Sequence, residues 1–201
     1  MPGCKLRFVS EAVSIVRDGH ASIPTYARIS IAFGVGSRLV VEPVDDGLRG
    51  LCFREEAVMP AYVKDYDALD GGPMAWATQF AVDNWGLLLA SSGAVLVGGA
   101  ALAFECPCAH VAEPVPESAC LWDIRVQPEF RGRGVGASLV REVKKWATER
   151  GFRHLHAETQ NVNVPACRFY RANGFRLVAV HARAYAELPE EAMLLWEREL
   201  P

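Results

Sequence analysis

A turn rich in glycine and arginine, set between a strand and a helix, most restricts what this sequence can fold into. The turn reads Arg131-Gly-Arg-Gly-Val-Gly136 and lies between the apolar run Ala119–Val126 and the segment Gly134–Arg150, whose apolar residues recur at helical spacing. Glycines let the backbone approach a ligand closely, and a helix N-terminus offers free N–H groups and a positive dipole end. With the charges of Arg131 and Arg133, the turn predicts a pyrophosphate site. The alternative is an ordinary turn with two solvated arginines.

Strands and helices alternate after this turn. His154–Gln160 predicts a strand, and Pro165 begins a short helix that ends at Asn173-Gly174. Phe175–Tyr185 and Ala192–Leu200 predict the last two strands. This alternation indicates parallel pairing with right-handed crossovers.

The uncharged segment Asn84–Phe104 is long enough to cross a bilayer. Ser91-Ser92-Gly93 interrupts it, however, and no lysine or arginine stands near either end to set an orientation. We therefore predict a hairpin of Trp85–Ala90 with Ala94–Phe104. Gly98-Gly99 indicates a bulge or a close backbone approach.

The N-terminal part is harder to assign. Residues 1–35 show no clear pattern beyond a short helix from Pro24 to Ile31, whereas Ser37–Pro43 and Leu48–Val58 predict a strand pair joined by a turn. Residues 60–83 are polar with aromatics, and Gly71-Gly72-Pro73 indicates that the segment ends in a loop. With 201 residues and 51% apolar composition, the chain can form one domain over residues 1–201. The expected fold is a mixed α/β sheet with helices on both faces.

Charge and composition restrict the partners. A net charge of -3 argues against nucleic-acid binding through phosphate contacts and suits a cationic small molecule. Residues 1–30 show no signal-peptide pattern, so we expect a cytoplasmic protein without membrane attachment, with its six cysteines reduced. Cys106, Cys108 and His110 form a C-x-C-x-H cluster, but no fourth ligand is visible, and we predict no metal.

The turn also fits a relaxed dinucleotide fingerprint. Gly132-x-Gly134-x-x-Ala137 has the spacing, and Glu158 follows at about the distance of a ribose-binding acid. That fold needs several more parallel strands, yet only 65 residues follow Gly136. We therefore place the oxidoreductase interpretation second.

A further block reads Asn163-x-x-Ala166-x-x-x-Tyr170-x-x-x-Gly174-Phe175. With the turn, which fits the pattern Gln/Arg-x-x-Gly-x-Gly/Ala, the sequence resembles the GNAT superfamily of acyl-CoA-dependent N-acyltransferases. Within it, the segment Glu158–Tyr170 is similar to streptothricin acetyltransferases. So are Tyr62–Tyr66, Tyr185 and Ala192–Trp196. The chain departs from these proteins at Trp122-Asp123, where members often carry an acidic pair.

This resemblance implies a mostly antiparallel central sheet with a splayed parallel strand pair. It implies that the backbone at Ile124, Arg125 and Val126 pairs with the pantetheine arm of acetyl-CoA, which Asn163 and Ala166 also contact. The N–H groups of the turn would hold the pyrophosphate. That set comprises Arg131, Gly132, Arg133, Gly134, Val135, Gly136 and Ala137. Tyr170 would act as general acid toward the departing thiolate.

The residues themselves agree with a role for Tyr170. It follows Pro165 by five positions, so it lies just over one turn into the helix. A phenol of pKa near 10 can give a proton to a thiolate. The alternative is that Tyr170 is a packed aromatic beside Phe169.

An amine nucleophile must lose a proton before it attacks. For an amine of pKa about 10.4, this costs roughly 4.6 kcal/mol at pH 7. Asp123 and Glu158 are the candidates for base or substrate binding, unless a water chain serves or each only pairs with Arg125 or Arg153. Tyr62, Asp65 and Tyr66 are candidates for the substrate wall. His154 and His156 fit surface or satisfied positions.

The predicted function is an N-acetyltransferase that moves an acetyl group from acetyl-CoA to a primary amine, without a metal. The preferred acceptor is the β-lysine amine of a streptothricin-like antibiotic. Another small amine (a polyamine, an aminoglycoside or an amino-acid derivative) is the first alternative. A CoA-binding regulatory module without turnover is the second. Superfamily members often form dimers, so a homodimer is a further expectation.

Overall fold

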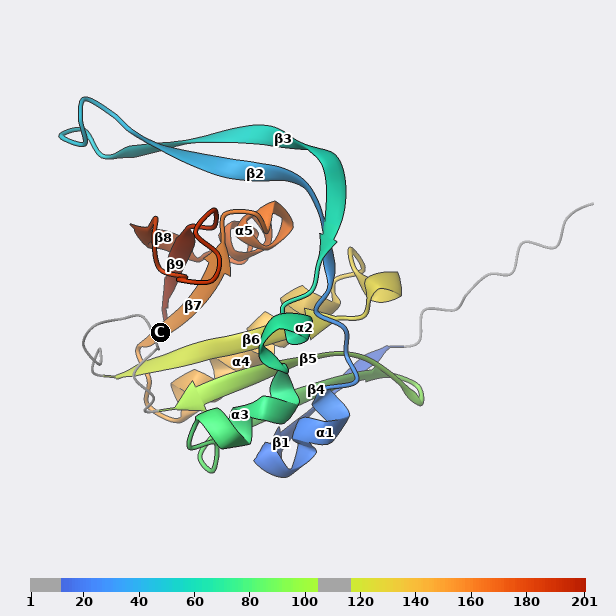
Figure 1. Cartoon of the computed structure of the whole chain (residues 1–201). Coiled ribbons are helices and arrows are strands. Elements are labelled where there is room, and N and C mark those ends of the chain that lie inside the picture. The colour runs from blue at the N-terminus through green and yellow to red at the C-terminus, as the bar shows by residue number, and fades with distance from the viewer. Residues whose placement is uncertain (1–11, 105–116) are drawn as a thin grey trace, which may run out of the picture.

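A mixed sheet forms the centre of the molecule in the computed structural model, which describes residues 12–104 and 117–201 (Figure 1). In this part of the chain the sheet has seven strands. Across the sheet they are β1 (Val13–Gly19), β4 (Gly86–Ser92), β5 (Val95–Phe104), β6 (Ser118–Val126), β7 (His154–Gln160), β9 (Met193–Glu199) and β8 (Arg176–His181). The helices are α1 (Ile23–Tyr26), α2 (Asp67–Asp70), α3 (Pro73–Gln79), α4 (Val135–Glu149) and α5 (Val164–Ala172), with 3-10 turns at His20–Ser22 and Pro128–Phe130.

The parallel pair β6–β7 separates partway along its length. Ser118–Leu121 pairs with His154–Ala157, and beyond these residues β6 stays with β5 while β7 stays with β9. The register of β5 and β6 shifts at the same place, where Trp122 is the extra residue of a bulge. A bulge bends its strand and increases its local twist. The predicted splayed pair in a mostly antiparallel sheet is therefore confirmed.

The parallel pairing predicted for the successive strands β6, β7 and β8 is confirmed for β6 with β7 but wrong for β7 with β8, which are not neighbours. β9 inserts between β7 and β8 and runs antiparallel to both. Its residues Met193, Leu194 and Trp196 are buried, whereas every residue of β8 is at least partly exposed. The more apolar strand takes the interior position because it gains more from burial.

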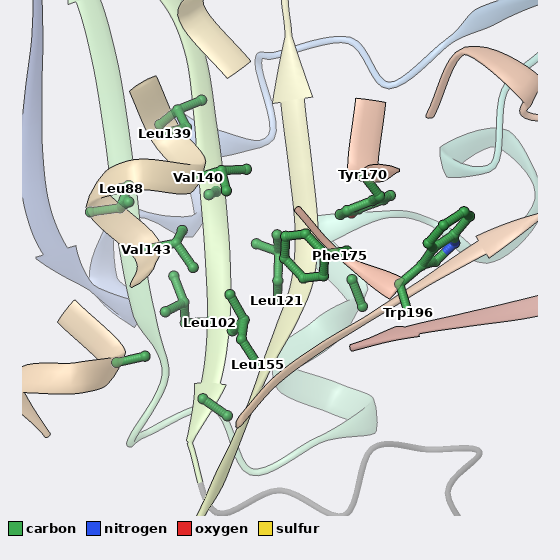
Figure 2. Packing of buried hydrophobic residues seen from close by; sticks show 14 of the residues in the cluster. Leu88, Leu102, Leu121, Leu139, Val140, Val143, Leu155, Tyr170, Phe175 and Trp196 are labelled. Atoms are coloured by element: carbon green, nitrogen blue, oxygen red, sulfur yellow. The ribbon is translucent and has the colours of Figure 1, made fainter. Parts of the chain in front are cut away.

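Two apolar layers cover the two faces of the sheet. On one face, Leu139, Val140 and Val143 of α4 pack with Leu102 and Leu121 of the sheet (Figure 2). On the other face, α1 and α3 contribute Tyr26 and Trp76 to a second cluster with strand residues such as Leu87. The expected helices on both faces are thus present.

The hairpin predicted from the uncharged segment is β4–β5. Gly98 and Gly99 face positions where a side chain would collide with backbone, because a Cβ would lie 2.9 Å from the oxygen of Arg125 at Gly98 and 2.7 Å from that of Leu88 at Gly99. The register shifts beside them, between Ala90 and Ser91. Both expectations, a bulge and a close approach, are confirmed. None of the helices in the described ranges is long and apolar enough to cross a membrane.

The strand pair predicted early in the chain forms a long arm, the hairpin of β2 (Phe33–Pro43) and β3 (Leu51–Lys64). The arm arches over β7, β9 and α5 (Figure 1). It is joined to them by Asn161, whose Nδ2 and backbone carbonyl bond the backbone of Leu39, and by an ion pair between Glu55 and Arg168.

Several elements differ from expectation. The loop expected from Gly71-Gly72-Pro73 is only the short break between the helices α2 and α3, where Gly71 is left-handed, and α3 begins at Pro73. β1 was not anticipated, and α1 ends at Tyr26 rather than Ile31. The Cys106–His110 cluster lies outside the described residues.

The close packing at Gly99 gives a stability prediction. Gly99→Ala would place a Cβ 2.7 Å from both the Leu88 carbonyl oxygen and the ring of Tyr26. We therefore expect the free energy of unfolding to fall by about 2 kcal/mol. Urea unfolding followed by circular dichroism measures this loss. Gly34→Ala on β2 is the control, since its Cβ would meet no atom within 4 Å. Equal stability of the two variants would show that the close packing at Gly99 does not exclude a side chain.

Candidate functional site

One large cavity opens where β6 and β7 separate. Its volume is about 1490 Å³, above the range of about 300–1,000 Å³ typical of a site for one small ligand. Residues 121–126 of β6 and 156–160 of β7 form its two sides. The turn before α4 (residues 131–136, the α4 turn), the helices α2, α3 and α5, and the segment after β8 also contribute lining residues.

The α4 turn presents a set of free backbone donors. Gly132 and Gly134 adopt φ values of 71° and 84°, which only glycine takes without strain. Gly134 is the N-cap, has no side-chain cap, and precedes a first turn without acidic residues. Within the described ranges, the N–H groups of residues 132–137 form no hydrogen bond. This arrangement suits an anion with several oxygens, as predicted.

The two arginines of the turn have different roles. Arg131 lines the cavity, and its Nε and Nη2 donate to the carbonyls of Val126 at 2.9 Å and Ser30 at 3.4 Å. Its guanidinium therefore ties the turn to the end of β6 and to the segment after α1, while keeping its charge. Arg133 is exposed and its guanidinium lies 5.3 Å from the ring centre of Phe130.

The expected cofactor edge lies between the turn and the gap. Ile124, Arg125 and Val126 line the cavity and pair with β5 but not with β7. A strand whose second edge is unpaired can accept another extended chain. Asn163 and Ala166 line the same side, and the Asn163 Oδ1 accepts the Ala166 N–H at 3.2 Å as the cap of α5.

Tyr170 is both a packed aromatic and a cavity residue. It lies on α5, is buried, and its ring centre is 5.5 Å from Phe169, 5.1 Å from Phe175 and 6.1 Å from Trp196 (Figure 2). Burial raises the pKa of Tyr170 well above its usual range. The hydroxyl thus stays protonated at physiological pH and can act as a donor.

Asp123 follows the Trp122 bulge directly and lines the cavity with a side chain that is 8% exposed. Its Oδ2 accepts from Arg125 at 2.6 Å, so the pairing considered from the sequence does occur. Burial nevertheless outweighs this cation and raises the pKa of Asp123 to about 6. Arg153, the other arginine considered, lies instead 3.4 Å from Glu117.

Glu158 faces the cavity from β7 within a hydrogen-bonded chain. The hydroxyl of Tyr185 donates to its Oε1 at 2.5 Å, and the Gln160 amide donates to that hydroxyl at 3.1 Å. Burial and the nearby Glu158 charge raise the pKa of Tyr185. The Tyr185 hydroxyl therefore fixes the orientation of the Glu158 carboxylate, which lines the cavity.

The expected substrate wall is only partly at the cavity. Tyr66 lines it, and its hydroxyl donates to Glu191 at 2.6 Å. Tyr62 and Asp65 do not line the cavity. Tyr62 lies on β3 and is 43% exposed. Asp65 Oδ1 instead accepts the backbone N–H of Asp67 at 3.1 Å.

The histidines are satisfied, as expected. His154 Nδ1 lies 2.9 Å from Glu197, and His156 Nε2 lies 3.3 Å from the Ser118 hydroxyl. Burial lowers the pKa of His156. Although His156 touches the cavity, these contacts give it a structural role.

The sequence reasoning missed a group of cavity residues on α2, α3 and β6. Two carboxylates, Asp67 and Asp70, face an aromatic surface made by Trp76, Phe80 and Trp122. The only signal in the sequence was the mixture of aromatic and acidic residues in positions 60–83. That composition cannot identify which of them meet a distant strand.

Comparisons with known proteins agree with this geometry. Residues 55–175 match the model of the acetyltransferase (GNAT) family. The chain is 36% identical to streptothricin acetyltransferase A of Bacillus subtilis (strain 168) over 80 residues, 39% of this chain and 46% of that protein. It is 43% identical to the streptothricin acetyltransferase of Streptomyces lavendulae over 63 residues, 31% of this chain and 33% of that protein. The chain thus spans less than half the length of these curated relatives.

Solved structures share the fold over nearly the whole chain. A Bacillus anthracis protein assigned as a streptothricin acetyltransferase, solved in complex with acetyl coenzyme A, superposes with a TM-score of 0.73 at 25% identity. That comparison covers 94% of this chain and 99% of the other. Nourseothricin acetyltransferase gives the same TM-score at 24% identity, with the same coverage of both chains.

The free donors of the α4 turn predict an anion effect on stability. Inorganic pyrophosphate should raise the melting temperature, since it binds the folded turn and not the unfolded chain. Arg133→Ala should reduce this rise, whereas Arg141→Ala on α4, whose guanidinium contacts Ser138, should not. Thermal shift with pyrophosphate at low salt measures both. A rise that Arg141→Ala and Arg133→Ala diminish equally would assign the effect to general surface charge.

Proposed function

Since this chain belongs to the acetyltransferase (GNAT) family, we propose that it transfers an acetyl group from acetyl-CoA to a primary amine on a small cationic molecule. One observation carries the proposal above the others. A single cavity runs from a turn with free backbone donors, along an unpaired strand edge, to two carboxylates beyond it.

The residues present fit acetyl-CoA. The N–H groups of residues 132–137 would hold the pyrophosphate, and the free edge at Ile124–Val126 would hold the extended pantetheine arm, with Asn163 and Ala166 beside it. Bound there, acetyl-CoA supplies an activated acetyl thioester. Tyr170 lines the same cavity and would donate its hydroxyl hydrogen to the departing sulfur.

The two carboxylates have different surroundings, which supports different roles. Arg125 contacts Asp123 through Oδ2 and leaves Oδ1 toward the cavity, whereas Glu158 is engaged with Tyr185. We propose that Asp123 takes a proton from the acceptor's ammonium group before the nitrogen attacks. Glu158 would bind the acceptor's positive charge. A pKa of about 6 leaves Asp123 ionised at pH 7 and brings it nearer to that of an amine than an ordinary aspartate.

In the transfer, the amine nitrogen bonds to the acetyl carbon and the carbon–sulfur bond breaks. The acceptor ammonium gives its first proton to Asp123 before the nitrogen attacks, and its second proton passes to water as the amide forms. The thiolate receives the hydrogen bond, and finally the proton, of Tyr170. Both residues return to their starting states by exchange with water. The chain's own residues and water therefore suffice for the proton movements.

A cationic acceptor is supported by the lining beyond Asp123. Asp70 supplies a negative charge that Arg125 does not pair, and the ring of Trp122 supplies a face that attracts cations. The relatives named as streptothricin acetyltransferases favour the β-lysine amine of a streptothricin-like antibiotic as the acceptor. Another small polyamine or aminoglycoside is the alternative. A cytoplasmic enzyme with reduced thiols remains part of the proposal.

Release of thiol from acetyl-CoA tests the proposal. Purified protein is assayed with streptothricin, spermidine, kanamycin and lysine, and mass spectrometry identifies the acetylated nitrogen. We expect the highest kcat/KM with streptothricin. Turnover confined to another amine would overturn the choice of acceptor, and tight binding of acetyl-CoA without turnover of any amine would favour a regulatory CoA-binding module.

Removing the Tyr170 hydroxyl should affect turnover more than binding. We expect Tyr170→Phe to lower kcat by about 100-fold, the scale of positioned proton transfer, with an almost unchanged Kd for acetyl-CoA. The ring contacts with Phe175 and Trp196 are kept in this variant, so stability should hold. Single-turnover kinetics and calorimetry separate the two effects. An unchanged kcat would remove the acid role from Tyr170.

A further inference from the structure

We infer that Asp67 and Arg125 form a clamp that positions Asp123 as the base of the acetyl transfer. The catalytic half of this inference rests on the proposed function, whereas the clamp itself rests on geometry alone. Asp67 lies on α2, and Arg125 and Asp123 lie two residues apart on β6.

The guanidinium of Arg125 is saturated by partners from three parts of the chain. Its Nη1 and Nη2 donate to the two oxygens of Asp67 at 2.6 and 2.8 Å, and Nη1 also lies 3.3 Å from the Ile29 carbonyl. Its Nε and Nη2 both lie 2.6 Å from Asp123 Oδ2. A planar fork with this many contacts leaves Arg125 a single orientation.

The clamp is buried against aromatic rings. The Arg125 side chain is 1% exposed, and its guanidinium lies 5.5 Å from the ring centre of Tyr26 and 5.9 Å from that of Trp76. A charge in such surroundings is costly unless it is paired. Arg125 therefore cannot move to solvent, and Asp123 is held wherever Arg125 is held.

The clamp leaves one oxygen of Asp123 available. Oδ2 takes both contacts from Arg125, whereas Oδ1 takes none from it. Asp123 also lines the cavity on the side where β6 leaves β7. Fixing one oxygen directs the other, so Oδ1 is the atom that takes the proton of the amine. Asp67 touches no reacting atom in this arrangement and is a positioning residue, as is Arg125.

The charges of the clamp act on Asp123 in opposite directions. Arg125 lowers its pKa by attraction, while Asp67 and burial raise it. The other titratable groups facing it are Tyr26 from α1, whose hydroxyl also lowers the pKa of Asp123, and Tyr170 from α5. Both are neutral at physiological pH because burial raises their pKa values. Removing the negative charge of Asp67 should thus lower the pKa of Asp123, and removing the positive charge of Arg125 should raise it.

These opposite shifts can be measured without turnover. Carbon-13 NMR of labelled aspartate carboxyls, assigned by difference with Asp123→Asn, gives the titration of Asp123 in each full-length variant. We expect a downward shift in Asp67→Asn and an upward shift in Arg125→Gln. Asp70→Asn is the matched control, because Asp70 lies on the same helix but accepts from the Gly72 N–H and not from Arg125. Its titration should equal that of the wild type.

The acid limb of kcat/KM then links the clamp to catalysis. Because the base must be ionised, the limb should move to lower pH in Asp67→Asn and to higher pH in Arg125→Gln. Misplacement of the base should also cost Arg125→Gln about 100-fold in kcat at pH 7, with little change in the Kd for acetyl-CoA. Arg125→Lys keeps the charge without the fork, so the limb should stay near its wild-type position while kcat falls.

The outcomes separate the clamp from the proposed function. If the pKa of Asp123 is unchanged in both Asp67→Asn and Arg125→Gln, the clamp is wrong. If this pKa shifts but the acid limb of kcat/KM does not, Asp123 is not the base. If the wild type acetylates no amine and the titration still shifts both ways, the proposed function fails and the geometry of the clamp stands. If Arg125→Gln does not fold, Asp67→Asn alone tests the clamp. A lower pKa of Asp123 in that variant supports the clamp, and an unchanged pKa overturns it.

Discussion

The separation of β6 from β7 is the constraint on which the rest of this structure depends. The two strands share a parallel register only from Ser118 to Leu121, and the bulge at Trp122 then turns β6 away. An open seam in the middle of a sheet would normally be costly, because it leaves backbone polar groups without partners. Here the seam becomes the cavity, and its unpaired edge is the place where an extended ligand can add its own hydrogen bonds.

Each end of the seam is fixed by a different kind of interaction. At one end, the dipole and free N–H groups of α4 favour negative charge, and Arg131 anchors the turn through the carbonyls of Val126 and Ser30. At the other end, Asp123 and Glu158 favour positive charge. The molecule thus has free backbone donors and two carboxylates around one cavity, which is the arrangement that the proposed transfer between an anionic donor and a cationic acceptor requires.

Local patterns allowed much of this to be predicted. The helix expected over Gly134–Arg150 is α4 within one residue at each end, and the hairpin of β4 and β5 has the bulge that Gly98-Gly99 indicated. Such features depend on residues close together in the sequence, namely glycines that relieve strain and apolar residues at a regular period. β1 and the helices α2 and α3 were missed, because their short segments carry too few periodic residues to stand out from loops.

By itself the sequence determined the turn before α4, the cap of α5 and the position of Tyr170, since each follows from spacings of a few residues. Only the tertiary structure decided that β9 lies between β7 and β8, that Arg131 is held by backbone carbonyls, and that Asp67 meets Arg125. The last two residues are 58 positions apart, and their meeting depends on how α2 packs against β6. The physical reason is that spacing reports only on neighbours along the chain, whereas burial and charge pairing depend on which distant segments the whole fold brings together.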